Sequence, residues 1–400
     1  MRIAVLSPRN PVPVYTGLLE RTYQTCRFLG ERHTVNVFFP DEPGRQDEEG
    51  RVPDHQPFER TKLESPVLDV LGRAVPDYSA LKGLYHTHPW LYGSLRSTLQ
   101  RFDPDLLVVE FPYLMPLTRA ASRGFDCPVI LSEHNVEYKF AERLGIPLWR
   151  LLRRFEVHAC NQADAVFTVS ETDRDTLAAQ LDDGTEVGVA PNGVDVGRYR
   201  PARERDSALV RERYQLTSPV LVFHGNLGNA QNAEVVDLLV EDVFPAVRRE
   251  FDDASLMLLG ADPPEETPPG VVTTGVVDDL PAHIAAADVA VAPMLSGSGT
   301  NLKILEYLAT GVPVVTTRIG AEGLPLRHGE TAALADPADV PAATVRLLRD
   351  PDRRETLGTN GRDLAVSEFS WSRTLEPYER AIERLLDTHR ASEGMRTTNP

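Results

Sequence analysis

Short apolar runs of strand length alternate with helix-length amphipathic segments along this chain, and the alternation occurs twice. The first series of predicted strands covers residues 3–6, 35–39, 106–109, 129–131, 165–169 and 187–189. The second series covers residues 220–223, 255–259, 271–274, 289–292, 312–316 and 332–335. Strands that alternate with helices are typical of parallel sheets covered on both faces. The sequence therefore predicts an α/β protein with two Rossmann-like, doubly wound domains and a cleft between them.

The length of the chain fits two domains better than one. A chain of 400 residues exceeds the roughly 250 to 300 residues that one hydrophobic core usually organises. The strand pattern restarts after the motif PNGVDVGRYRP, so we place the hinge at residues 196–218. We predict an N-terminal domain over residues 1–195, a C-terminal domain over residues 196–369 and a disordered tail over residues 390–400.

The charge balance restricts the partners. The formal net charge is −17, and lysine occurs only as Lys62, Lys82, Lys139 and Lys303. An acidic surface repels the phosphate backbone of nucleic acids, whose binding requires basic side chains. We therefore exclude nucleic acid as a partner and expect a surface adapted to high salt.

The N-terminus and the cysteines indicate a cytoplasmic protein. The first apolar run lacks the basic, apolar and cleavage regions of a signal peptide, and no run reaches the roughly 18 apolar residues of a membrane span. The cysteines, Cys26, Cys127 and Cys160, form no metal-binding pair or disulfide framework. The stretch IPLWRLLRRFEVHA is ordinarily an amphipathic helix packed on a core, but its basic residues also suit a peripheral contact with an anionic membrane.

The most informative segment is VAVAPMLSGSGTNLKILEYLATGVPVVTT. It predicts a buried strand, a Gly and Ser turn, a helix over residues 300–309 that ends at Gly311, and a second strand. The glycines of the turn allow a ligand to approach the backbone, Thr300 is expected to cap the helix, and the free N–H groups at the helix start suit a diphosphate. The predicted donor-binding residues of this turn are Ser298, Gly299, Thr300, Asn301 and Leu302.

Lys303 and Glu306 lie three residues apart, so they share one face of the predicted helix. The ammonium group can then hold a phosphate while the carboxylate accepts hydrogen bonds from two ribose hydroxyls. The alternative is an exposed helical ion pair, which is worth only about 0.3 kcal/mol. The position of the turn between two buried strands favours the ligand site.

Together these motifs identify a family. The segment EYLATGVPVV resembles the donor site of the family-four, or group 1, glycosyltransferases of GT-B fold, and IAVLSP, SEHNVE, ADAVFTVSE, APNGVD and FHGNLGNAQN resemble other parts of the same family. The resemblance implies a GT-B fold and a retaining, metal-independent glycosyltransferase. Its co-substrate would be a nucleotide diphosphate sugar, with no other cofactor, and its acceptor a glycan, a lipid-linked or a small molecule. With the acidic composition, we expect the source to be a halophilic archaeon.

The resemblance also assigns roles to residues. Glu306 matches the ribose-binding glutamate, His134 the histidine that lines the sugar and acceptor site, and Gly17 a residue of the first phosphate-facing loop. With Lys303, His134 and Glu306 form the expected catalytic set, although a lone histidine is more often structural. In this fold a C-terminal helix, here at about residues 370–390, packs back on the N-terminal domain.

Glu110 and Glu133 are the candidates for the acceptor side. Each falls at the end of a predicted strand that faces the presumed cleft, where a carboxylate can bind hydroxyl groups of an acceptor. The alternative for each is a solvated loop carboxylate. The aromatic-bearing residues 78–92 are a further candidate for facing the acceptor, whereas the acidic, proline-rich residues 40–60 are predicted to form a loop.

Three positions depart from the family pattern. Ser298 stands where many members carry an acidic residue, and Asn226 and Gln231 stand where many carry an Arg and a Lys that neutralise the diphosphate. Lys303 is then the best candidate for holding the leaving diphosphate. The departures leave two alternatives open, an inactive homologue that binds a nucleotide sugar, and an epimerase or hydrolase on the same fold. Asp103 and Asp105 precede a strand, so we predict no metal site there.

Overall fold

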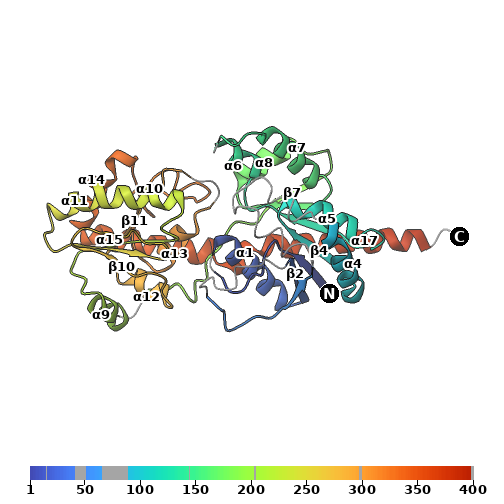
Figure 1. Ribbon diagram of the computed structural model, residues 1–400, viewed down its shortest axis with the longest axis horizontal. Coiled ribbons are helices and arrows are strands. Elements are labelled where there is room, and N and C mark those ends of the chain that lie inside the picture. The colour runs from blue at the N-terminus through green and yellow to red at the C-terminus, as the bar shows by residue number, and fades with distance from the viewer. Residues whose placement is uncertain are drawn as a thin grey trace. The chain divides into compact units, whose positions relative to one another are not determined.

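The computed structural model describes residues 1–14, 16–40, 51–64, 89–143, 145–201, 204–296 and 300–397. The chain divides into two compact units (Figure 1). Unit 1 comprises Met1–Pro191 and Leu375–Pro400, and unit 2 comprises Asn192–Thr374. Each unit contains a parallel sheet with helices packed against it, which confirms the predicted α/β class with two Rossmann-like domains.

The sheet of unit 1 contains the strands β1 (Arg2–Leu6), β2 (Thr34–Pro40), β3 (Glu59–Leu63), β4 (Leu106–Glu110), β5 (Val129–Ser132), β6 (Ala165–Thr168) and β7 (Glu186–Val189). Their order is β3-β2-β1-β4-β5-β6-β7, and the neighbouring strands are parallel. The strand order reverses between β1 and β4. Ligands of open α/β sheets bind beyond the carboxyl ends of the strands at such a switch point.

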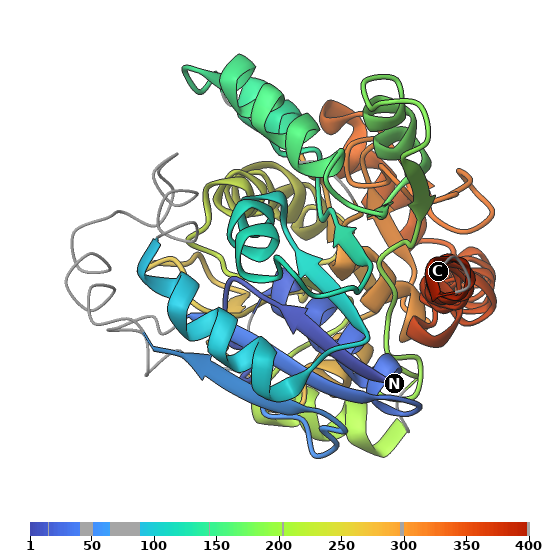
Figure 2. The ribbon, with the colours of Figure 1, turned by 90° about the vertical axis from the view of Figure 1, so that its right-hand side faces the viewer.

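The helices of unit 1 cover this sheet. They are α1 (Gly17–Gly30), α4 (Pro89–Phe102), α5 (Met115–Ala121), α6 (Glu137–Arg143), α7 (Trp149–Cys160), α8 (Glu171–Ala178) and α17 (Glu376–Thr397), with the 3-10 turn η1 (Pro112–Leu114). Figure 2 shows α4, in cyan, lying across the blue strands β1 to β3. Its buried Leu91, Leu95 and Leu99 recur at the four-residue spacing that places them on one helical face.

The C-terminal helix α17 belongs to unit 1. Tyr378 is fully buried there, with its ring centroid 4.4 Å from that of Phe167 in β6, and Glu379 pairs with Arg32. The prediction of a disordered tail from residue 390 is wrong as far as Thr397, because α17 continues to that residue. Extending a helix that has already begun adds one hydrogen bond for each residue fixed, so the polar composition of the tail did not end it.

Strand β3 was missed in the sequence. The prediction of a loop over residues 40–60 is wrong at its end, because β3 begins at Glu59. This strand lies at the edge of the sheet, where its sequence ERTKL shows no apolar run of the kind that marks a central strand. Residues 41–50, and residues 78–88 of the aromatic-bearing region, lie outside the described residues, while residues 89–92 begin α4.

The sheet of unit 2 contains β8 (Val220–His224), β9 (Ser255–Leu259), β10 (Val271–Thr273), β11 (Val289–Ala292), β12 (Val314–Thr316) and β13 (Ala333–Leu334). Their order is β10-β9-β8-β11-β12-β13, again with parallel neighbours. The switch point of this sheet therefore lies between β8 and β11. Every strand predicted in either half lies within two residues of an observed one.

The helices of unit 2 are α9 (Glu204–Arg213), α10 (Ala230–Leu238), α11 (Phe244–Arg248), α12 (Leu280–Ala285), α13 (Leu302–Ala309), α14 (Val340–Leu348), α15 (Pro351–Glu368) and α16 (Trp371–Thr374), with the turns η2 (Leu239–Val243) and η3 (Pro337–Asp339). In Figure 1, α10, α11 and α14 lie on one face of the sheet, and α9 and α12 on the other. A continuous apolar core formed by the strands and these helices fixes the position of α13.

The stretch around α7 packs against the core of unit 1 with some of its apolar side chains and exposes others. Trp149 and Leu152 pack against the core of unit 1, whereas Leu148 and Leu151 are 73% and 60% exposed. No described helix is long and apolar enough to span a membrane. The peripheral membrane contact stays a prediction.

Candidate active site

Helix α13 places Lys303 and Glu306 at the switch point of unit 2. It starts at Leu302, after the loop that follows β11, and ends in a tight turn at Gly311, whose φ is 74°. In that turn the N–H of Gly311 donates to the carbonyl of Leu308, and the N–H of Val312 donates to the carbonyl of Tyr307. A helix that ends with this pair of bonds usually has a glycine in the left-handed conformation just after it. The predicted end of the helix at Gly311 is therefore confirmed.

The start of α13 differs from the prediction. Asn301, not Thr300, is the N-cap residue, and its side chain makes no capping bond. Thr300 is buried and its hydroxyl has no partner among the described residues. The helix starts at Leu302, two residues later than predicted. The first N–H groups of the helix, including that of Leu302, still lack a carbonyl partner within the helix. Ser298 and Gly299 lie outside the described residues, so their predicted role stays untested.

Glu306 is held by a histidine at the end of β8. Nε2 of His224 lies 2.6 Å from Oε2 of Glu306, and Nδ1 of His224 lies 2.9 Å from the hydroxyl of Tyr307. That hydroxyl also accepts a 3.0 Å hydrogen bond from the backbone N–H of His224. Nε2–H of the imidazole donates to the carboxylate of Glu306, so His224 links Glu306 to Tyr307.

The ionised form of Glu306 is favoured by its neighbours. Burial alone would raise the pKa of this carboxyl group, but hydrogen bonds from His224 and Tyr199 and the positive charge of Arg198 lower it below its usual value. Tyr199 is fixed in turn by Arg362, whose Nη1 donates to the carbonyls of Tyr199 and Ala309 at 2.6 Å each. Arg362 thus ties the segment before α9 to the end of α13. An ionised carboxylate in this position can accept hydrogen bonds from hydroxyl groups.

Lys303 takes a separate partner. Its Nζ donates to Oδ1 of Asn232 at 2.7 Å and lies 4.9 Å from the ring centroid of Phe223. Burial lowers its pKa from the ordinary 10.5 to about 8, against the opposing effect of the negative charge of Glu306. The alternative of an exposed ion pair between Lys303 and Glu306 is wrong, because each side chain is half-buried and bonded to a different residue.

Asn232 links Lys303 to the loop that follows β8. Its Nδ2 donates to the carbonyl of Asn226 at 2.7 Å while its Oδ1 holds the ammonium group. Asn226, where an arginine was expected from the family, uses Oδ1 to accept the N–H groups of Gly228 and Asn229. Gln231 lies in the first turn of α10, and its N–H donates to Oδ1 of Asn229. The amides at Asn226 and Asn232 therefore shape the loop beside Lys303.

The predicted residues of unit 1 fall into two groups. Glu110 ends β4 beside the switch point and is fully buried, with Oε2 2.5 Å from Nε2 of His134. The imidazole of His134 also stacks on Phe111, with ring centroids 4.3 Å apart. Burial lowers the pKa of His134, and the nearby charge of Arg21 lowers it further, although the hydrogen bond and charge of Glu110 act in the opposite direction. His134 is therefore a neutral, oriented side chain.

The surroundings of Glu110 include side chains from distant parts of unit 1. Arg21 of α1 is fully buried, and the negative charge of Glu110 partly offsets the lowering of its pKa by burial. Tyr378 of α17 interacts electrostatically with the same arginine and carboxylate. Gly17 is the first residue of α1, where the hydroxyl of Thr16 accepts the N–H of Leu19. The contact of Gly17 with the donor stays a prediction.

Glu133 joins a different cluster from Glu110. It is 1% exposed and accepts a 3.4 Å hydrogen bond from the thiol of Cys160. Burial raises its pKa, and the negative charges of Glu156 and Glu137 raise it further. Glu156 in turn accepts the N–H groups of Glu137 and Tyr138 at the start of α6. The alternative of solvated loop carboxylates is wrong for Glu110 and Glu133, and the position of Glu133 fits a structural role better than acceptor binding.

Several site residues were missed in the sequence. Asn232, His224, Tyr199 and Arg362 each make the contacts described above, but their signals were weak. His224 and Asn232 lie within the motif FHGNLGNAQN, His224 at the end of β8 and Asn232 in α10. Their place just beyond a strand was the signal that could have identified them as site residues. Arg21 gave no signal. No group of three or more His, Cys, Asp or Glu side chains that could hold a metal ion lies in the described ranges.

A carboxylate and a lysine on the same helix, beyond two central parallel strands, are an arrangement that suits a ligand with both hydroxyl and phosphate groups. Two family models match the chain, and both describe glycosyltransferases. Residues 15–198 match the model described as Glycosyltransferase Family 4, and residues 218–350 match the model described as Glycosyl transferases group 1.

Named relatives extend the comparison. The chain is 33% identical over 295 residues to the GDP-mannose-dependent alpha-(1-6)-phosphatidylinositol monomannoside mannosyltransferase of Mycolicibacterium smegmatis, covering 67% of this chain and 74% of the relative. It is 30% identical over 237 residues to a D-inositol 3-phosphate glycosyltransferase of Arthrobacter, covering 53% and 54% of the two chains. The protein belongs to the group 1, family-four glycosyltransferases and is a glycosyltransferase.

Solved structures share the fold. A sucrose-phosphate synthase from Thermosynechococcus elongatus superimposes with a TM-score of 0.77 at 18% identity, over 97% of this chain and 99% of that one. The Anabaena protein HepE, in complex with UDP and glucose, gives a TM-score of 0.69 at 16% identity, over 96% and 99% of the two chains. The GT-B fold expected from the sequence is thereby confirmed.

Proposed function

We propose that this glycosyltransferase retains the configuration of the transferred sugar and works without a divalent metal ion. Retention is supported by the M. smegmatis relative, whose name describes an alpha linkage made from GDP-mannose. Mannose is alpha-linked in that donor, so the named reaction preserves the configuration. Hexose transfer to a glycan, a lipid-linked acceptor or a small molecule is the corresponding reaction for this chain.

The observation that carries the donor assignment is the pair Glu306 and Lys303, each held by its own partner on one face of α13. In the proposed complex, Glu306 accepts hydrogen bonds from two ribose hydroxyls, and Lys303 donates to the diphosphate together with the first N–H groups of the helix. Lys303 and the helix start then stabilise the negative charge that develops on the leaving diphosphate, which is the role proposed in place of a metal ion.

The proposed chemical step exchanges one C–O bond for another. The bond between the anomeric carbon and the diphosphate oxygen breaks, and the acceptor oxygen bonds to the same face of an oxocarbenium-like sugar. The acceptor proton passes to an oxygen of the leaving diphosphate. His134, kept neutral by burial and oriented by Glu110, is proposed to bind a hydroxyl of the sugar or the acceptor. The protein mainly positions the reactants and stabilises charge.

Calorimetry with UDP-glucose, GDP-mannose and ADP-glucose in molar KCl tests the donor site, because salt suppresses non-specific charge contacts. Replacing Glu306 by Ala removes two hydrogen bonds to a charged group, each worth about 1.5 to 3 kcal/mol, so the affinity should fall about 100-fold or more. Exposed Glu355 of α15, replaced by Ala, is the matched control and should bind like the parent. Equal binding by Glu306→Ala and the parent would contradict the assignment.

Two further measurements test the finer proposals. The anomeric configuration of the product, read by proton NMR, should match that of the donor. Turnover should be the same in buffer with a metal chelator and in buffer with added Mg²⁺ or Mn²⁺. An inverted product, or turnover that requires the added ion, would refute the corresponding proposal.

A further inference from the structure

One imidazole contacts two consecutive residues of α13. Nε2 of His224, at the end of β8, lies 2.6 Å from Oε2 of Glu306, and its Nδ1 lies 2.9 Å from the hydroxyl of Tyr307. The rings of His224 and Tyr307 are nearly perpendicular, with an interplanar angle of 89° and centroids 4.9 Å apart. Consecutive residues of a helix point in different directions, so an imidazole that contacts both is fixed at its two nitrogen atoms.

The backbone of His224 is held by the same tyrosine. The N–H of His224 donates to the hydroxyl of Tyr307 at 3.0 Å, and both residues are buried. The N–H of the next residue, Gly225, donates to the carbonyl of Leu259 in β9 at 3.0 Å. Neither the backbone nor the side chain of His224 can therefore move away from Glu306 without breaking hydrogen bonds in the core of unit 2.

The carboxylate of Glu306 keeps acceptor sites beyond those that its neighbours fill. An ionised carboxylate offers about four lone-pair sites. His224 and Tyr199 each donate a hydrogen bond to Glu306, so about two sites are left for other donors. The side chain of Glu306 is 18% exposed, so part of its surface is open to a ligand.

The remaining acceptor sites suit the two hydroxyls of a ribose. A 2′-deoxyribose would leave one of these sites without a donor. A site that is built to bind a hydroxyl rejects the analogue that lacks it, because its own polar group is then left unpaired. Such selection requires that the carboxylate is held in one orientation by the residues behind it. The contact from Nε2 of His224 provides that orientation for Glu306.

We infer that His224, held by Tyr307, is a positioning residue that makes Glu306 select ribose over 2′-deoxyribose in the nucleotide. The inference rests on the proposed function, in which Glu306 binds the ribose hydroxyls. His224 acts through the carboxylate and not on the ribose itself. The ligand selected at this site is a ribonucleoside diphosphate, and the ligand rejected is its deoxy analogue.

Calorimetry with matched nucleotides tests the inference. UDP, GDP and ADP are titrated into the full chain in molar KCl, and the nucleotide that binds most tightly is compared with its 2′-deoxy analogue. We expect the parent to bind the deoxy analogue at least about tenfold more weakly, because one hydrogen bond to a charged group is lost. Glu306→Ala should bind the two nucleotides with nearly equal affinity.

Two substitutions of His224 separate its hydrogen bond from its shape. His224→Phe keeps a ring but cannot donate to Glu306, so the preference for ribose should fall at least about threefold. His224→Gln keeps an N–H donor on its side chain and should hold the preference within about twofold of the parent value. Tyr307→Phe removes the hydroxyl that fixes the imidazole, and it should also lower the preference.

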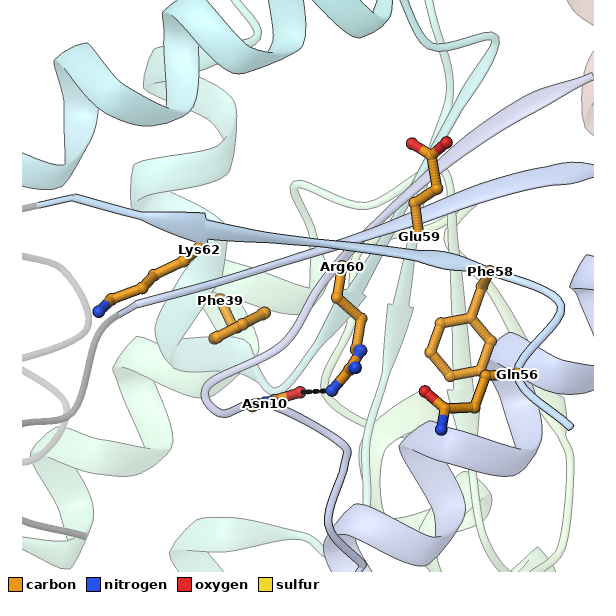
Figure 3. A pocket seen from close by; sticks show the side chains of 7 residues that line it. All are labelled: Asn10, Phe39, Gln56, Phe58, Glu59, Arg60 and Lys62. Carbon is orange, nitrogen blue, oxygen red and sulfur yellow. Dashed lines mark hydrogen bonds between the residues drawn. The ribbon is translucent and has the colours of Figure 1, made fainter. Parts of the chain in front are cut away.

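Two controls address other causes of a changed preference. His283 of α12 is a second buried histidine of unit 2, and its Nδ1 lies 2.7 Å from the carbonyl of Asp279. His283→Phe should keep the preference even if it lowers stability. A nucleotide can also be attracted by cations of unit 1, such as Arg60 in the groove beside β3, whose Nη1 donates to Oδ1 of Asn10 at 3.3 Å (Figure 3). Arg60→Gln should leave the preference unchanged.

The outcomes distinguish this inference from the proposed function. A preference for ribose that is lost in Glu306→Ala but stays at the parent value in His224→Phe would overturn the inference and leave the donor site in place. An equal loss of preference in His283→Phe would also overturn it, because general destabilisation would then explain the effect. A parent that binds both nucleotides equally well would contradict the role of Glu306 itself, and the inference would fall with it.

Discussion

The lowered pKa of Lys303 makes the proposed donor affinity depend on pH. Its ammonium group is half-buried beside Asn232 and Phe223, and burial lowers its pKa to about 8. A diphosphate placed beside this group favours the charged form. The free protein therefore loses the charge near pH 8, whereas the complex keeps it to a higher pH, and donor binding above pH 8 must take up a proton.

The size of the effect follows from the pKa. One unit above a pKa of about 8, only about one free molecule in ten still carries a charged Lys303, and each unit corresponds to about 1.4 kcal/mol. The affinity for the nucleotide sugar should therefore fall about tenfold from pH 7 to pH 9. Proton uptake on binding should be about half a proton at pH 8 and about 0.9 of a proton at pH 9.

Calorimetry measures both quantities. Titrations of the tightest-binding nucleotide sugar at pH 7, 8 and 9 give the affinity, and repeating each one in two buffers of different ionisation enthalpy gives the proton uptake. A nucleotide sugar is preferable to a free diphosphate, because its substituted diphosphate has no second ionisation near neutral pH. Lys303→Arg is the matched control, since its guanidinium stays charged across this range.

The control should bind with the same affinity at pH 7 and pH 9. The reasoning is refuted if the parent binds equally well at both, with heats that do not depend on the buffer. It is also refuted if Lys303→Arg shows the same tenfold loss as the parent, because the titrating group would then be another residue.

Three further predictions concern the neighbouring contacts. Asn232→Asp should move the midpoint of the affinity profile above pH 8, because a carboxylate partner raises the pKa of Lys303; an unmoved midpoint in calorimetry would contradict this. His224→Phe should lower the free energy of unfolding by about 1 to 3 kcal/mol in urea, because Glu306 loses its partner, and unchanged stability would argue against the pairing. Burial raises the pKa of Glu156 to about 8, so the folded state binds a proton that the unfolded state has lost above about pH 4.5, and stability should fall as the pH rises to about 8. Glu156→Gln should reduce that fall, and an identical pH profile would show that another group causes it.

The loop after β8 and the first turn of α10 carry neutral residues where the family pattern has two cations. Asn226 and Gln231 stand where the family pattern led us to expect an arginine and a lysine, and their amides and backbone instead organise the start of α10. Asn232 of the same loop region holds Lys303. Among the described residues, Lys303 and the start of α13 are therefore the groups proposed to hold the diphosphate, which is why the Lys303 predictions are the sharpest test of the proposed donor site.

Local patterns made much of the fold predictable. Apolar runs of strand length located the central strands, since a strand covered on both faces must be apolar throughout. The edge strand β3 escaped because only Leu63 of its five residues is buried and the others are at least partly exposed. The continuation of α17 to Thr397 escaped because chain ends are commonly disordered, whereas helix extension depends on the turn before it.

The candidate site was predictable only in part. The spacing of Lys303 and Glu306 placed them on one helical face, and the strand end before His134 placed this residue at the ligand-binding edge. The burial of Glu133 among other carboxylates was not visible, because a strand end looks the same in sequence whether a helix covers it or not. The halophilic source, the metal independence and the retaining chemistry remain predictions.

The sequence by itself determined the features that depend on neighbours a few residues apart: the strand and helix periods, the turn at Gly311, and the shared face of Lys303 and Glu306. Only the tertiary structure decided which partners these side chains take. Asn232 and Lys303 are 71 positions apart, and His224 and Glu306 are 82 positions apart. These pairs meet because β8 and β11 are neighbours in the sheet, and strand order is set by how the whole core packs rather than by any local pattern.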